Sequence, residues 1–76
     1  MNTPQPQTEV AFLAEESPQG GFTARAVGAS IFTAADTVQG LRDNVREAVE
    51  CHYDTQHRPQ SIRLRFVREE VLWLDG

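Results

Sequence analysis

The sequence has no lysine, a single cysteine, and no apolar run near the roughly 18 residues that a membrane-spanning helix needs. The lone cysteine, Cys51, cannot form an internal disulfide, which is typical of proteins from reducing compartments. The N-terminus also lacks the basic and then apolar pattern of a secretory signal. We therefore expect a cytoplasmic protein with no membrane partner.

Positive charge is scarce as well. Seven basic residues, all arginine, stand against eleven acidic ones, so the formal net charge is −4. This balance disfavours binding driven by neutralising nucleic-acid phosphates and suits a basic partner instead. Seventy-six residues make one domain and leave no room for a cofactor enzyme built from several domains. Because a core this small supplies only about 3–5 kcal/mol, we also expect self-association or a partner.

The spacing of apolar residues predicts an α+β fold. Residues 1–7 contain two prolines and predict a flexible tail, followed by one domain over 8–76. Period-two alternation and turn residues predict strands at 8–16, 22–27, about 30–33, 61–67 and, as a short final strand, 71–74. The resulting order is β-β-β-α-β(-β), a mainly antiparallel sheet with one long helix on one face.

The predicted helix covers about 37–54. Asp36 is its expected N-cap, and Gln39 would complete a capping box. An apolar stripe at the 3.6-residue period is expected to pack on the sheet, formed by Val38, Leu41, Val45, Ala48, Val49 and His52. The strand residues expected to meet this stripe are Phe12, Phe22, Ile62, Leu64 and Phe66.

The only cluster of metal-ligand residue types is Cys51, His52, Asp54 and His57, around the C-terminal end of the predicted helix, and its spacing matches no strong zinc pattern. We interpret His52 as a histidine at the core edge and Cys51 as a partly buried thiol. We therefore expect no catalytic, metal-binding or cofactor-binding residues, and no cofactor.

Two acidic pairs, 15–16 and 69–70, and three arginines are further candidates for a binding site. Neighbouring strand residues point to opposite faces, so each acidic pair is interpreted as solvated, with a cross-strand Mg²⁺ site as the alternative. Arg25, Arg63 and Arg65 share the sheet face away from the helix. We expect them to form cross-strand ion pairs, and an RNA-binding platform is the alternative.

The first predicted strand is apolar on both faces, which is typical of strands buried on both sides. One helix covers only one face, so we predict a homo-oligomer, most simply a twofold dimer that can include strand exchange. The expected interface residues are Leu13, Phe32, Arg63, Arg65, Val71, Leu72, Trp73 and Leu74.

Three segments, at 20–24, 35–38 and 44–49, resemble the HicB antitoxin N-terminal domain family, and within it the short solitary HicB-like proteins of bacteria. The family has a Gly-Gly-aromatic hairpin, a Gly-Asp-Thr-Leu helix entry and an Asn-x-x-Glu-Ala helix. Here they read Gly-Gly-Phe-Thr-Ala, Ala-Asp-Thr-Val and Asn-Val-Arg-Glu-Ala-Val. The resemblance spans roughly residues 8–72. Ala35 replaces the usual glycine, and Gly40 stands where the family prefers a helix-favouring residue.

The resemblance implies a partial ribonuclease-H-like fold without catalytic carboxylates. It also implies a role in covering a small basic HicA-like toxin that cuts mRNA. Full antitoxins continue into a helix-turn-helix or ribbon-helix-helix segment, and we expect no such DNA-binding segment here. Some similar short proteins carry the name of a 2-oxoisovalerate dehydrogenase component, but a thiamine-diphosphate site needs large domains.

The leading hypothesis is thus a non-enzymatic, antitoxin-like interaction module. The alternatives are a small metal-dependent nuclease derived from the same fold and an RNA-binding regulator.

Overall fold

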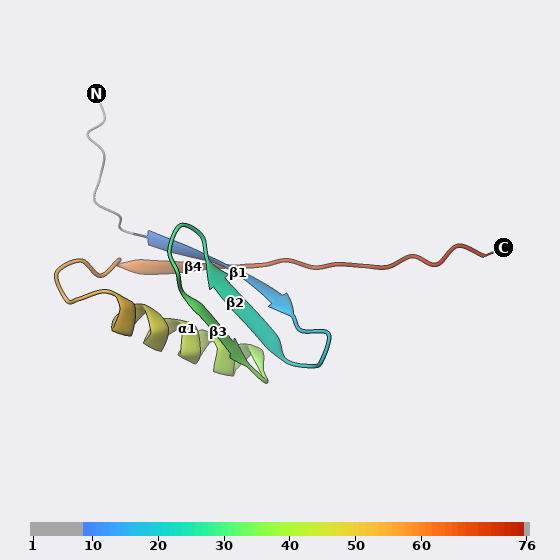
Figure 1. The fold of residues 1–76 in the computed structure, drawn as a ribbon, viewed down its shortest axis with the longest axis horizontal. Helices are drawn as coiled ribbons and strands as arrows, with labels where there is room; N and C mark the ends of the chain where they lie inside the picture. The colour runs from blue at the N-terminus through green and yellow to red at the C-terminus, as the bar shows by residue number, and fades with distance from the viewer. Residues whose placement is uncertain (1–8, 76) are drawn as a thin grey trace, which may run out of the picture.

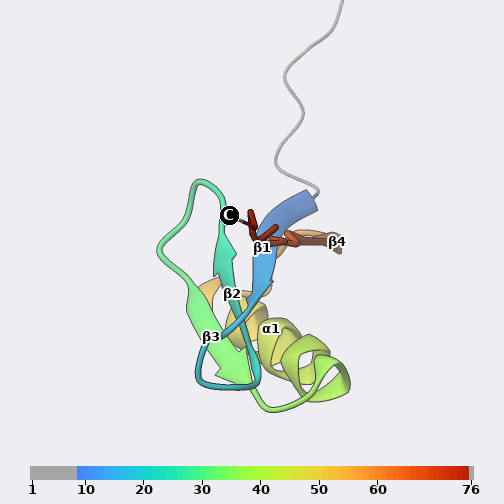
Figure 2. The same cartoon turned by 90° about the vertical axis from the view of Figure 1, so that its right-hand side faces the viewer.

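The computed structural model describes residues 9–75, so the predicted tail over 1–7 lies outside the described residues. The chain forms the elements β1 (Glu9–Glu16), β2 (Phe22–Ala26), β3 (Phe32–Ala35), α1 (Val38–His52) and β4 (Ser61–Phe66). Figure 1 shows α1 lying along the sheet, and Figure 2 shows it on one face only. The α+β class and the order β-β-β-α-β are confirmed. None of the helical structure described over 9–75 is long and apolar enough to cross a membrane.

The sheet is mixed, with the strand order β3-β2-β1-β4. The first three strands form antiparallel pairs, whereas β4 lies parallel to β1 at the other edge. Parallel neighbours need a long crossover connection. The helix supplies it, because α1 lies between β3 and β4 in the chain. As a result, the N-terminal strand lies inside the sheet and the last strand lies at its edge.

The turn between β1 and β2 depends on glycine. Ser17 N–H donates to the Gly21 carbonyl oxygen and Gly20 N–H donates to the Ser17 carbonyl oxygen, each over 2.9 Å. Gly20 and Gly21 have φ values of 101° and 80°, which L side chains rarely adopt. A Cβ at Gly21 would also lie 2.8 Å from the Ala35 carbonyl oxygen. The turn therefore packs directly against the end of β3.

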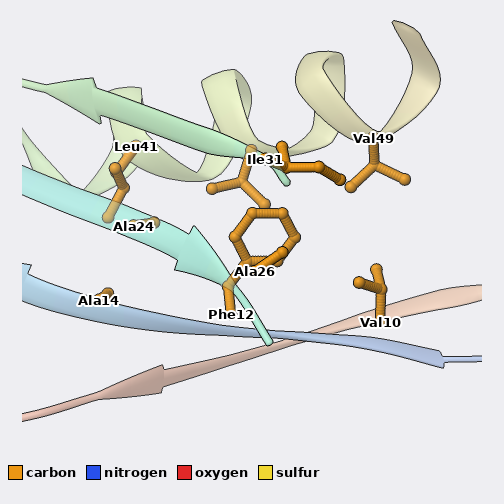
Figure 3. Packing of buried hydrophobic residues seen from close by; sticks show 9 residues of the cluster. Val10, Phe12, Ala14, Ala24, Ala26, Ile31, Leu41 and Val49 are labelled. Carbon is orange, nitrogen blue, oxygen red and sulfur yellow. The ribbon is translucent and has the colours of Figure 1, made fainter. Parts of the chain in front are cut away.

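The core lies between the sheet and α1 (Figure 3). The alternation predicted for the first strand is confirmed, because Val10, Phe12 and Ala14 of β1 are fully buried. Among the described residues, the hydrophobic core consists of the buried side chains Val10, Phe12, Ala14, Ala24, Ala26, Ile31, Leu41, Val45 and Val49. Ile31, which precedes β3, was not predicted in the core. Its carbonyl oxygen accepts a hydrogen bond from Ala26 N–H over 2.9 Å, which draws the residue inward.

The predicted helix cap and the predicted role of His52 are wrong. Thr37, not Asp36, is the N-cap: its Oγ1 accepts a hydrogen bond from Gly40 N–H over 2.9 Å. Gln39 instead donates to Asp43 over 3.3 Å. His52 is exposed because α1 ends there and the chain continues in extended conformation, so half-buried Tyr53 closes that end of the core.

Two strand predictions also need correction. The third strand begins two residues later than expected, at Phe32, because Ile31 belongs to the turn that follows β2. Phe66 was expected to meet the helix, yet 46% of it is exposed. The helix packs against β2 and β3, so it does not cover the end of β4.

The predicted final strand over 71–74 does not form. Residues 67–75, which we call the C-terminal arm, contain no strand and run straight away from the body in Figure 1. The last ladder bond is Val67 N–H to the Ala14 carbonyl oxygen, over 2.7 Å. Since β1 ends at Glu16, residues 9–75 contain no strand opposite the arm.

Candidate functional site

The sheet face away from α1, which we call the open face, carries a mixed apolar and basic row. The strand registers align Phe32 of β3 with Arg25 of β2, Arg25 with Leu13 of β1, and Leu13 with Arg65 of β4. Leu13 is half-buried, whereas 68% of Phe32 is exposed. One row across the sheet therefore brings together four of the residues considered in the sequence.

Arg63 lies on the same face but is already paired. Its Nε donates to Glu9 Oε2 over 2.8 Å, and its Nη2 donates to Glu9 Oε1 over 3.2 Å. The hydrogen bond from Arg63 lowers the pKa of Glu9 below its ordinary value, although partial burial opposes this. The same contact raises the pKa of Arg63. Over the part of the chain that the structure describes, Arg25 and Arg65 form no ion pair.

The open face combines exposed apolar side chains with arginines. Exposed apolar side chains next to arginines are typical of interfaces between proteins. A single-stranded nucleic acid would need several aromatic side chains on which bases stack, and the row holds one, Phe32. With Arg63 neutralised by Glu9, two arginines are left for a ligand.

A second feature lies where β1 ends beside the C-terminal arm. A cavity of about 350 Å³ is lined by three exposed carboxylates, which we call the acidic corner: Glu15, Glu16 and Glu69. The apolar residues Val67 and Val71 also line it. Glu15 and Glu16 are both exposed, as expected for a solvated pair, and both line this cavity at the end of β1. Nothing in the sequence signalled this arrangement, which depends on the parallel pairing of β4 with β1.

The acidic corner does not satisfy the geometry of a metal site. Among residues 9–75, no group of three histidine, cysteine, aspartate or glutamate side chains is arranged to hold a metal ion. Over the same residues, Glu15, Glu16 and Glu69 take part in no ion pair. The arrangement offers carboxylate oxygens to the arginine or lysine side chains of another molecule.

The residues after α1 form a turn. Asp54 Oδ1 accepts hydrogen bonds from the backbone N–H of Gln56 and of His57, with N···O distances of 3.1 and 2.9 Å. The same oxygen lies 2.7 Å from His57 Nδ1. The contact with His57 lowers the pKa of Asp54. Cys51 is exposed, whereas the sequence predicted a partly buried thiol. The rings of His52 and Tyr53 contact edge to face, with 4.8 Å between their centroids. Asp54 and His57 therefore serve the local turn.

Comparisons with known proteins identify two relatives. The chain is 49% identical over 51 residues to a UPF0150 protein of Archaeoglobus fulgidus, a match that covers 67% of this chain and 76% of the relative. It is 37% identical over 66 residues to a UPF0150 protein of Thermotoga maritima, covering 87% and 93%. No family model matches the chain. No solved structure matches it either.

Proposed function

The chain belongs to the UPF0150 family, and we propose that it is a non-enzymatic, HicB-like module that binds and covers a small basic toxin. The observation that supports this most directly is the acidic corner. Three exposed carboxylates share one cavity with two apolar side chains. Such a surface accepts charge-assisted hydrogen bonds from arginine or lysine while its apolar part excludes water.

The charge of the chain supports the same partner chemistry. A net charge of −4 on 76 residues attracts a basic protein and accelerates the encounter. The carboxylates of the acidic corner belong to the end of β1 and the beginning of the C-terminal arm. They lie where β1 ends, and all three are exposed, so a second protein can reach them.

The three HicB-like segments have a structural role that is compatible with this function. Gly21 of the first segment packs on the Ala35 carbonyl of the second. The Asn44 side chain of the third donates to the carbonyl oxygen of Ala34 over 2.8 Å. The segments thus hold β3 between the turn and the helix, and partner binding falls to other residues.

The test is coexpression with a small basic ribonuclease encoded next to this chain. The full chain should restore growth and stop mRNA cleavage, and the two proteins should copurify at moderate salt. Because the contact is electrostatic, the double charge reversal Glu15→Arg with Glu69→Arg should abolish protection. Failure of the wild-type chain to inhibit the ribonuclease overturns the proposal.

The matched control is Glu47→Arg with Glu50→Arg, which changes the net charge equally but on the exposed face of α1. This control should keep most of the protection. Equal loss in both double variants would show that only net charge matters and would contradict binding at the acidic corner. Circular dichroism of each variant verifies that it is folded.

The rival from the sequence is a metal-dependent nuclease. Mg²⁺ prefers carboxylate ligands, but among residues 9–75 no group of three such side chains is arranged to hold a metal ion, so this candidate is the weaker one. Its test is cleavage of RNA or of an RNA–DNA hybrid by the purified chain with Mg²⁺ or Mn²⁺. Metal-dependent cleavage that is lost in Glu15→Gln and in Glu69→Gln would replace the toxin-binding proposal. No cleavage at high protein concentration would remove the nuclease.

A further inference from the structure

The C-terminal arm carries four consecutive large apolar side chains that contact little of their own chain. The exposed fractions of Val71, Leu72, Trp73 and Leu74 rise from 69% to 95%. A contiguous apolar segment of this kind is a usual mark of an interaction site. Its extended course, seen in Figure 1, leaves its backbone free to pair with another strand.

A matching edge exists on β4. Within the described residues, β4 pairs only with β1, so its other edge is open. Beside that edge, Ile62 and Leu64 are half-buried and line a cavity of about 210 Å³ together with Val45 of α1. Arg42 and Arg46 of α1 also line this cavity. The edge therefore offers both unpaired backbone groups and an apolar groove.

The arm cannot easily reach the edge of its own β4. It continues β4 directly, and pairing with itself would need a tight reversal within residues 67–70. These residues are Val-Arg-Glu-Glu, whereas tight hairpin turns favour glycine, asparagine or aspartate. The same edge on a second copy of the chain requires no reversal.

We propose that the C-terminal arm of one copy pairs antiparallel with β4 of a second copy, which returns its own arm in the same way. The occupant of each β4 edge is thus a second copy of this chain, and the contact is a closed twofold exchange. Residues 61–74 then form one continuous strand in each copy. The two sheets join through their β4 edges.

Symmetry determines which residues meet. A twofold axis perpendicular to the sheet keeps each side chain on its face, so opposite residues must both have even numbers or both have odd numbers. With the axis at Arg68, Leu74 lies opposite Ile62 and Leu72 lies opposite Leu64, on the side of the apolar groove. This register fills the groove with aliphatic side chains.

The side chains on the other face of the joined strands also fit this register. In the same register Trp73 lies opposite Arg63 and Val71 lies opposite Arg65. An arginine over an indole ring gains a cation–π attraction. Glu69 becomes the diagonal neighbour of Arg65, which has no ion pair among the described residues of its own chain.

The first experiment uses the single tryptophan as a probe. Trp73 is 87% exposed, and the chain has no other tryptophan. On concentrating the full chain from about 0.1 to 100 μM, the Trp73 emission should shift to shorter wavelength as sedimentation shows a dimer. A folded monomer at about 100 μM with unchanged emission overturns the proposal.

The second experiment tests the register. In a Cys51→Ser background, Arg68→Cys places two thiols opposite each other at the axis, within disulfide distance. Glu70→Cys is the matched control, because its two copies would be four residues apart along the strands, roughly 13 Å. Mild oxidation should cross-link Arg68→Cys as a dimer and leave Glu70→Cys single. Absent or equal cross-linking in the two variants overturns this register.

A third variant tests whether the C-terminal arm, and not another surface, forms the dimer contact. Leu72→Arg with Leu74→Arg places positive charges beside Arg42 and Arg46, which line the groove, and should give a monomer. Its circular dichroism should stay that of a folded chain because neither leucine belongs to the core. A dimer that persists in this variant contradicts the arm exchange. These readouts need no toxin, so they are independent of the proposed function.

Discussion

Asn44 of α1 and Ala34 of β3 are joined by a hydrogen bond from the Asn44 side-chain amide to the Ala34 carbonyl oxygen, over 2.8 Å. It ties the helix to β3, which is an edge strand of the sheet that the described residues form. Side chain and backbone are ten residues apart, so the bond also restrains the loop that enters the helix.

Asn44→Ala should lower the free energy of unfolding by about 0.5–1.5 kcal/mol, the usual net contribution of such a bond. Asn44→Asp should cost more, because a carboxylate oxygen would face the carbonyl oxygen without a proton between them. Urea unfolding at pH 7 measures both. Asp tolerated better than Ala would contradict this arrangement.

The helix cap predicts different effects for substitutions at the neighbouring residues Asp36 and Thr37. Thr37→Ala removes the oxygen that accepts from Gly40 N–H and should cost about 1 kcal/mol. Asp36→Ala lies one residue before the cap and should change stability by less than about 0.5 kcal/mol. Thermal unfolding of the two variants compares them directly. A larger loss for Asp36→Ala would restore the cap predicted from the sequence.

Alanine substitutions at the two glycines of the β1–β2 turn should also lower the stability of the fold by different amounts. Gly20→Ala meets open space, so only its positive φ opposes the change, at a cost of about 1–2 kcal/mol. Gly21→Ala carries the same penalty and also drives a Cβ to 2.8 Å from the Ala35 carbonyl oxygen. It should therefore be clearly the less stable variant in urea. Equal losses would show that the end of β3 can move away.

Periodicity was sufficient to predict most of the fold. The alternation around Phe12 and the 3.6-residue stripe through Leu41, Val45 and Val49 each identified a buried face, because burial imposes these periods on strands and helices. Boundaries were predicted less well. A cap is decided by one hydrogen bond, and Asp36 and Thr37 are both good capping residues.

The pairing of strands that are distant in the chain could not be predicted from the sequence. The predicted strand at 71–74 rested on local apolarity alone, whereas a strand also needs a partner, and β1 ends before the arm begins. The acidic corner has the same origin, since only the parallel pairing of β4 with β1 brings Glu69 near Glu16. Such contacts between distant residues leave no periodic signal in either segment.

The contact between Glu9 and Arg63 predicts a specific pH dependence. The pKa of Glu9 is lowered in the folded chain by its hydrogen bond to Arg63. A carboxylate with a lowered pKa stabilises the fold at any pH above its ordinary value of 4.5, and this contribution is lost as the pH falls through the lowered pKa. Glu9→Gln should thus be less stable than the wild type at pH 7, and the gap should begin to narrow as the pH falls below 4.5 and vanish once the pH is below the lowered pKa of Glu9.

The measurement is the urea midpoint of the wild type and of Glu9→Gln from about pH 7 down to about pH 3. Both partners are partly exposed, with side-chain exposures of 59% for Arg63 and 41% for Glu9, so the gap should be small and should shrink in high salt. Glu16→Gln, at the other end of β1, is the matched control, because Glu16 is exposed and takes part in no ion pair over residues 9–75. A gap for Glu9→Gln that stays constant to pH 3 would show that the loss comes from packing and not from the charge of Glu9.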